Sequence, residues 1–210
     1  MEENKLGQSV QGIVKVDGSD VTQSQTRALT REERMKMQKT TPQGAELALC
    51  DISGSMAGPA KDGRRCIDCL RDAMAPLVGQ VHVLAFESQV HEVDADLIPE
   101  PMGGTDLTRA LDRALQLKPK AVLVVSDGEP NNRDTALEAA RMIVAQLKIR
   151  INVIYIGPDD TSAKDFMKEL AKIGHGRYKE FDIAVNNPLL LGQKVKGMLA
   201  LPAPKGAINL

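Results

Sequence analysis

The stretch Ala121-Val122-Leu123-Val124-Val125 is a continuous apolar run, and Ser126-Asp127-Gly128 follows it directly. A short apolar run that is rich in β-branched residues and bounded by turn residues predicts a strand covered on both faces of a sheet. Such strands are typical of parallel sheets, in which helices connect successive strands. The stretch therefore predicts an α/β fold.

Strand and helix patterns alternate on both sides of this run. Strands are predicted at 45–50, 81–86, 90–93, 121–125, 151–156 and 178–181, and helices at 61–77, 105–117, 134–147, 162–173 and 188–200. The gap between the second and third strands is too short for a crossover helix, so these two should pair antiparallel. The pattern predicts a doubly wound, mostly parallel, Rossmann-like sheet with helices on both faces and one short antiparallel edge strand.

The first 43 residues differ in composition from the rest of the chain. They are rich in Gln, Thr, Lys and Glu and have few large apolar side chains, so they cannot bury a core of their own. Within them we expect a short strand and tight turn at 13–18, as in a hairpin, and a short helix after a capping box at 30–33. We expect 1–43 to be an extension that is partly disordered, 44–201 to be one domain, and 202–210 to be a C-terminal tail.

Composition argues against several classes of partner. The 27 basic and 28 acidic residues give a net charge of −1, which argues against nucleic-acid binding through a broad basic surface. Aromatic residues make up only 2% of the chain, too few for base-stacking platforms. No stretch approaches the ~20 apolar residues that span a bilayer, the N-terminus lacks a signal-peptide core, and the three cysteines are an odd number. We therefore expect a cytoplasmic protein that binds neither nucleic acid nor membrane.

Polar residues follow the predicted strands at the edge where α/β sheets bind ligands. Asp51, Ser53 and Ser55 follow the first strand, Asp127 follows the strand at 121–125, and Thr105 precedes a helix. All are hard oxygen donors, which suit Mg²⁺, or Mn²⁺ or Ca²⁺, better than zinc. Two carboxylates and three hydroxyls would leave such an ion positive, with a position that a partner's carboxylate could fill.

These residues have simpler interpretations as well. Asp51-Ile52-Ser53-Gly54-Ser55 can be a strand end with a capping turn, Thr105 can cap its helix, and Asp127-Gly128 can be only a turn. Asp106 is expected in the first turn of the helix, where the helix dipole favours an acid. Glu129 is expected to be a solvated loop residue.

Taken together, Asp51-Ile52-Ser53-Gly54-Ser55, Thr105 and Asp127 resemble the complete metal-ion-dependent adhesion site of von Willebrand factor type A domains. The resemblance covers roughly residues 44–200, and it does not include the N-terminal extension. It implies metal contacts from Ser53, Ser55 and Thr105, with Asp51 and Asp127 acting directly or through water. It also implies that a Glu or Asp of a protein partner completes the metal's coordination.

The expected function is metal-dependent protein–protein interaction. Relatives that are stand-alone proteins of bacteria and phages often act as adaptors, for example beside AAA+ ATPases or in stress and defence assemblies. One alternative is a metal-dependent phosphoryl or ester hydrolase, but the three segments contain no His as general base, and position 53 is Ser where a dehalogenase-type hydrolase has Asp. The other alternative is a structural subunit with a purely stabilising metal. We expect that the protein is not an enzyme.

Two further features stand near the predicted site. Cys66 and Cys69 form a C-x-x-C pair, but they fall inside the helix predicted at 61–77, so packing is favoured over redox or zinc chemistry. Lys61, Arg64 and Arg65 are expected to be a solvated helix start, with a basic rim beside the metal as the alternative.

Overall fold

The computed structural model describes residues 45–181, 193 and 196–198. Two elements are short 3₁₀ helices, labelled η. In chain order the elements are β1 (Glu46–Asp51), η1 (Gly54–Ala57), α2 (Cys66–Met74), η2 (Ala75–Leu77), β2 (His82–Phe86), β3 (Val90–Val93), α3 (Leu107–Leu117), β4 (Ala121–Ser126), α4 (Arg133–Leu147), β5 (Ile151–Tyr155), α5 (Thr161–Ile173) and β6 (His175–Glu180).

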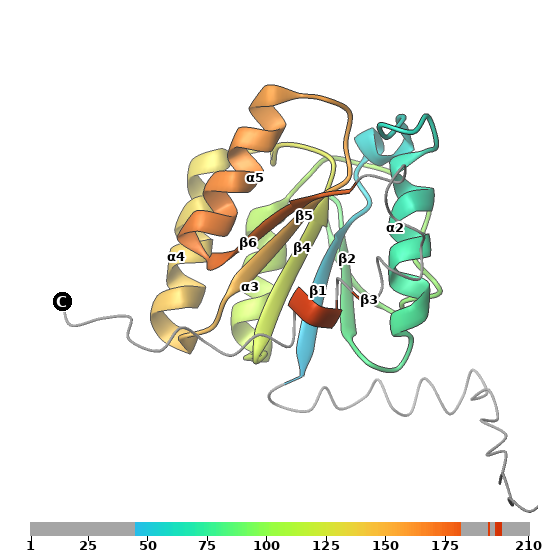
Figure 1. Cartoon of the computed structure of the whole chain (residues 1–210). Coiled ribbons are helices and arrows are strands. Elements are labelled where there is room, and N and C mark those ends of the chain that lie inside the picture. Colours follow the sequence, from blue (N-terminus) through green and yellow to red (C-terminus); the bar gives the residue numbers. More distant parts are fainter. Residues whose placement is uncertain (1–44, 182–192, 194–195, 199–210) are drawn as a thin grey trace, which may run out of the picture. The chain divides into compact units, whose positions relative to one another are not determined.

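The six strands form one sheet in the order β3-β2-β1-β4-β5-β6 (Figure 1). All neighbouring strands are parallel except β2 and β3, which pair antiparallel as expected from their short connection. The chain moves outward in one direction from β1 to β3, returns to β4 beside β1, and then moves outward in the other direction. The strand order therefore reverses between β1 and β4, which is where such sheets bind ligands.

Helices cover both faces of the sheet, as predicted. On one face, α2 packs over β1 and β2, with Ile67 and Leu70 among its fully buried side chains. On the other face lie α3, α4 and α5, and Phe166 of α5 is fully buried there (Figure 1). β1 and β4 lie at the centre of the sheet and are buried along almost their whole length, which explains their unbroken apolar sequences.

Two helices begin more than one residue later than predicted. α2 begins at Cys66 rather than 61, because residues 59–65 form a turn in which Gly63 has φ +80° and the Ala60 amide donates to the Arg64 carbonyl. α3 begins at Leu107, and Asp106 is its N-cap rather than a first-turn acid. The predicted end of the helix at 173 is confirmed, since α5 ends at Ile173 and Gly174 caps its C-terminus.

Several predictions concern residues that the structure does not describe. The strand, turn and helix predicted within 1–43 and the tail at 202–210 lie outside the described residues. Of the helix predicted at 188–200, only residues 193 and 196–198 are described, and they are helical. Among the described residues, no helix is both long enough and apolar enough to cross a bilayer.

Candidate functional site

The fold brings the three predicted segments together at the carboxyl edge of the sheet. Asp51 ends β1 and residues 52–55 follow it, while Ser126 ends β4, the direct parallel neighbour of β1, and Asp127 follows. The third segment, 103–105, reaches the same edge because the Gly54 amide donates to the Gly103 carbonyl at 3.1 Å. Because β1 and β4 are neighbours in the sheet, segments that are far apart in the sequence come together in one site.

The side chains of this site form a continuous hydrogen-bonded chain. Asp51 Oδ1 accepts from the Ser53 amide at 2.8 Å, and Asp51 Oδ2 accepts from Ser126 Oγ at 2.6 Å. Ser53 Oγ lies 3.0 Å from Ser55 Oγ, which donates to Asp127 Oδ1 at 2.9 Å. Four of the five predicted ligands are therefore linked directly to one another, and Ser126 holds the innermost carboxylate in place.

Thr105, the fifth predicted ligand, is not needed as a helix cap. Asp106 has that role, since its Oδ1 accepts from the Arg109 amide at 3.0 Å. Thr105 is fixed instead through its backbone, whose amide donates to Asn131 Oδ1 at 3.0 Å and whose carbonyl accepts from the Asn131 amide at 2.8 Å. Its half-buried side chain lines the same cavity as Ser55 and Asp127.

The two carboxylates lie in an environment that is short of positive charge. Asp51 is fully buried, and this burial raises its pKa, although hydrogen bonds from Ser126 and Ser53 act in the opposite direction. Burial, together with the charge of Asp51, raises the pKa of Asp127 to about 7. Buried carboxylates are normally paired with a cation or bound to a metal. The site thus favours a bound cation.

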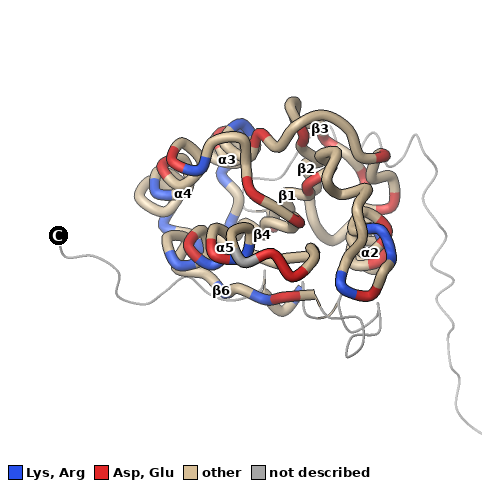
Figure 2. The backbone as a smooth tube through the Cα atoms, turned by 90° about the horizontal axis from the view of Figure 1, so that it is seen from above, with Lys and Arg blue, Asp and Glu red and all other residues tan. Residues whose placement is uncertain are grey.

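A cavity of about 480 Å³ opens beside these groups. Its lining comprises Ser55, Gly58, Pro59, Cys66, Thr105, Asp127, Gly128, Glu129, Pro158, Asp160 and Ala163. Three of these residues are acidic and none is Lys or Arg, although Glu129 pairs with Arg133 at 3.2 Å. Figure 2 looks down on this edge and shows acidic positions in the loops around β1, β4 and α5. A free carboxylate would be repelled from such a cavity unless a cation came with it.

The donor set fits a hard divalent cation but is unusually poor in carboxylates. Among the described residues, no group of three or more His, Cys, Asp or Glu side chains is placed to hold a metal ion. The site offers two carboxylates, Asp51 and Asp127, and its other oxygens are the hydroxyls of Ser53, Ser55 and Thr105. Oxygen donors of this kind suit Mg²⁺, Mn²⁺ or Ca²⁺, and their low total charge would leave a bound ion with positive character.

Sequence reasoning missed the residues that support the Gly103-Gly104-Thr105 loop. The Gly104 amide donates to Ser88 Oγ at 3.0 Å, and the buried Glu87 carboxylate accepts from the Ser88 amide. Gly103 has φ +66°, and a Cβ there would clash with Glu87 Oε2. The Gly103-Gly104 pair indicates that this loop packs closely against other residues. No local sequence pattern identifies Glu87 and Ser88 as those residues.

Cys66 and Cys69 both lie in α2, as predicted, but they fall in its first turn because the helix begins at Cys66. Cys66 lines the cavity, but its thiol is fully buried, and burial raises its pKa to about 12. Burial raises the pKa of Cys69 as well, even though the Arg64 guanidinium donates to its sulfur at 3.4 Å. Both thiols are free and stay protonated near neutral pH, which agrees with a packing role.

The basic residues beside the site are all paired. Lys61 contacts Glu180 at 2.9 Å, Arg64 contacts Asp72 at 2.7 Å, and Arg65 contacts Asp68 at 2.8 Å. They therefore do not present free positive charge to the cavity.

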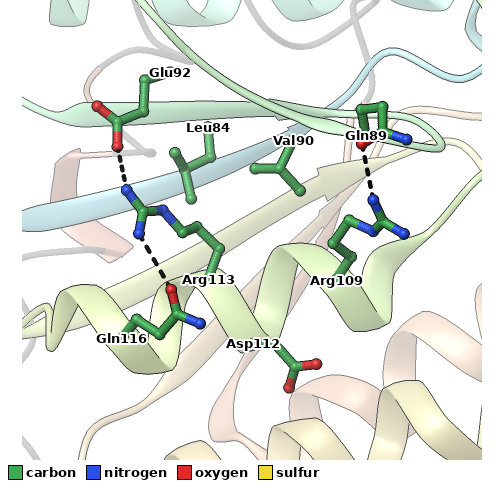
Figure 3. A pocket seen from close by; sticks show the side chains of 8 residues that line it. All are labelled: Leu84, Gln89, Val90, Glu92, Arg109, Asp112, Arg113 and Gln116. Carbon is green, nitrogen blue, oxygen red and sulfur yellow. Dashed lines mark hydrogen bonds and ion pairs between the residues drawn. The ribbon is translucent and has the colours of Figure 1, made fainter.

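A second hollow, of about 320 Å³, lies between α3 and the β2–β3 edge (Figure 3). Leu84 and Val90 lie between two arginines there, each of which bonds across the hollow. Arg109 donates to Gln89 at 2.8 Å, and Arg113 donates to Glu92 at 2.9 Å. These bonds tie α3 to β3, so this hollow has a structural explanation and lacks the clustered oxygen donors of the carboxyl edge.

Comparison with known proteins agrees with this architecture. Residues 85–180 match the family model of the von Willebrand factor type A domain, whereas no curated protein matches the chain. The structure titled manganese-loaded Plasmodium vivax TRAP protein is 21% identical, with a TM-score of 0.53 over 75% of this chain and 74% of that chain. A von Willebrand factor type A structure from Catenulispora acidiphila is 16% identical, with a TM-score of 0.54 over 77% of this chain and 43% of that chain. Identities this low show a common fold, and the stretch similar to the von Willebrand factor type A family model is 85–180, less than half of the chain.

Proposed function

We propose that this protein is a metal-dependent protein–protein interaction module. Asp51, Ser53, Ser55, Thr105 and Asp127 would hold one divalent cation, Mg²⁺ or else Mn²⁺ or Ca²⁺, and an acidic side chain of a partner protein would bind to it. The observation that carries the proposal is the hydrogen-bonded set of carboxylates and hydroxyls, short of positive charge and open to a cavity. Domains of this family commonly mediate protein–protein interaction, which agrees with this assignment.

The lining of the cavity gives a reason for metal dependence. Asp127, Glu129 and Asp160 face the space that a partner's Glu or Asp would enter. A bound divalent cation would supply the positive charge that attracts this side chain. Removing the cation should therefore abolish binding altogether, because repulsion between carboxylates would remain.

We further propose a cytoplasmic adaptor role, with a larger assembly such as an AAA+ ATPase or a stress or defence complex as the partner. The location is supported by the three cysteines, which are all free. The kind of assembly is supported only by the resemblance to stand-alone relatives. The partner's attachment point, an acidic side chain, is supported by the chemistry of the site.

The hydrolase alternative lacks support at this site. Among the described residues, those that line the cavity include no His, and burial keeps the Cys66 thiol protonated. One hydroxyl does adjoin a carboxylate, since Ser55 Oγ donates to Asp127 Oδ1 at 2.9 Å, but both groups are among the proposed metal ligands. A purely stabilising metal is the stronger competitor, and it makes a different prediction when the metal is removed.

The test uses Thr105→Val, a nearly isosteric change that removes one proposed ligand without touching the buried Asp51. The matched control is Thr108→Val in the first turn of α3, three residues beyond Thr105, where the hydroxyl contacts Thr135 Oγ1 at 2.9 Å. Tagged wild type and both variants are used to capture proteins from native lysate in Mg²⁺ and in EDTA.

A protein retained in Mg²⁺ by wild type and Thr108→Val, and lost with Thr105→Val or EDTA, is the expected result. Equal retention by all samples would place the interface elsewhere. Metal-dependent stability without metal-dependent retention would make the metal structural.

A further inference from the structure

The two walls of the cavity come from different parts of the chain. One wall contains Pro59 and belongs to the turn between η1 and α2. The second stretch, which we call the other wall, contains Pro158, Asp160 and Ala163, from the β5–α5 loop and the first turn of α5. Neither stretch belongs to a strand, so no strand pairing joins one wall to the other.

One carboxylate contacts both walls. Glu180 Oε2, at the end of β6, lies 2.9 Å from Lys61 Nζ and 3.1 Å from Lys164 Nζ. Lys61 is two residues beyond Pro59, and Lys164 directly follows Ala163. The other oxygen, Oε1, accepts from the Tyr178 hydroxyl at 3.2 Å, which fixes the orientation of the carboxylate. Glu180 thus bridges the two walls through a single oxygen atom.

This bridge is better shielded than an ordinary surface ion pair. The Lys164 side chain is only 10% exposed and also pairs with Asp159, while Lys61 and Glu180 are 34% and 31% exposed. The Lys164 ammonium lies over the Tyr155 ring, 5.9 Å from its centroid. The hydrogen bonds from Lys61 and Lys164 lower the pKa of Glu180 to about 2, so the carboxylate is charged at neutral pH. The three charges therefore form a linked network and not an isolated pair.

We propose that Glu180 is a positioning residue that fixes the width of the cavity by holding Lys61 on one wall and Lys164 on the other. On the function proposed above, this width decides which acidic partner segments can reach the metal. The positional role itself depends only on contacts within this chain, so it can be tested without metal and without partner.

The cavity contains its own reporter, because the Cys66 thiol lines it and is fully buried. Cys50, near the C-terminal end of the central strand β1, is equally buried, and we expect it to react only when the sheet unfolds. The rates at which N-ethylmaleimide modifies these two thiols are measured by peptide mass spectrometry at pH 7.5 in EDTA. The variant is Glu180→Gln, and the control is Glu92→Gln. Glu92, on β3 at the opposite edge of the sheet from β6, is 35% exposed and pairs with Arg113 at 2.9 Å.

Glu180→Gln should raise the rate at Cys66 at least fivefold and leave the rate at Cys50 unchanged, and Glu92→Gln should change neither. Lys61→Gln releases one wall by itself and should give the same pattern. In wild type, 1 M NaCl should raise the rate at Cys66 by screening the ion pairs, but it should have little effect on Glu180→Gln.

Unchanged Cys66 rates in both variants would overturn the proposal. A parallel rise at Cys50 would also overturn it, because the effect would then be global unfolding. An equal salt effect in wild type and Glu180→Gln would show that the ion pairs do not hold the walls. None of these outcomes bears on metal binding, which is tested separately.

Discussion

The hydroxyl of Ser126 should be a main determinant of stability at the site, even though it is not one of the proposed ligands. Ser126 Oγ donates to Asp51 Oδ2 at 2.6 Å, and the two residues are 2% and 0% exposed. Ser126 Oγ also accepts from the Gly128 amide at 3.2 Å. Ser126→Ala would therefore leave a buried carboxylate oxygen without its donor and a backbone amide without its acceptor.

A hydrogen bond to a charged group contributes about 1.5–3 kcal/mol, and leaving its buried partner unsatisfied places the loss in the upper half of that range. For a domain of this size, about 2–3 kcal/mol corresponds to a fall in Tm of about 5–10 °C. The assay is thermal unfolding followed by circular dichroism at pH 7.5 in EDTA, so that metal binding does not contribute. Ser162→Ala, at an exposed serine in the first turn of α5, is the control and should shift Tm by less than about 2 °C. If Ser126→Ala melts like this control, the hydrogen bond to Asp51 does not hold the site together.

Other substitutions test the backbone and the charges around the site. Gly103→Ala should lower the free energy of unfolding by about 1–3 kcal/mol, since Gly103 has φ +66° and its Cβ would meet Glu87. Gly63→Ala is the control, because Gly63 has φ +80° but a Cβ there would meet no neighbour, and it should lower the free energy of unfolding by only about 1 kcal/mol. If urea unfolding gives equal losses for the two variants, the contact with Glu87 does not contribute. The lowered pKa of Glu180 means that its stabilising contribution is complete above pH 4.5 and is lost as the pH falls toward 2. Urea unfolding of wild type and Glu180→Gln should therefore differ by about 1 kcal/mol at pH 6 and by clearly less at pH 3, and a constant gap would contradict the ion pairing. Lys148→Gly should raise the free energy of unfolding by about 0.5 kcal/mol, because this helix-capping residue has φ 57°, and a loss would show that its side chain contributes more than the strain costs.

The central strands could be predicted because their continuous apolar sequences fit few positions in a folded protein. A run such as 121–125 must be covered on both sides, and the parallel centre of a sheet provides that cover. The antiparallel β2–β3 pair followed from a connection too short for a helix. The start of α2 was placed too early because a local apolar stripe does not show that Asp62-Gly63 forms a turn.

The site was predictable as a set of oxygen donors but not as a bonded structure. Residue order alone places Asp51 and Asp127 at one edge, since parallel strands end on the same side. That Ser126 binds Asp51, and that Ser88 holds the Gly104 amide, depends on contacts between residues distant in sequence. The same is true of Glu180, whose two lysines are 119 and 16 positions away from it. No local sequence pattern predicts such pairs.

Whether Asp51, Ser53, Ser55, Thr105 and Asp127 hold a divalent cation is tested most directly by isothermal titration of the purified protein with Mn²⁺ and with Mg²⁺. Wild type, Thr105→Val and Thr108→Val are compared at pH 7.5. We predict one binding site in wild type and Thr108→Val. Thr105→Val should bind the metal ion at least about tenfold more weakly. Removing a residue that only hydrogen-bonds to a metal ligand already costs about tenfold in metal affinity, and Thr105 is proposed as a ligand itself. Absence of binding in wild type, or equal affinity in all three proteins, would contradict the proposed metal site.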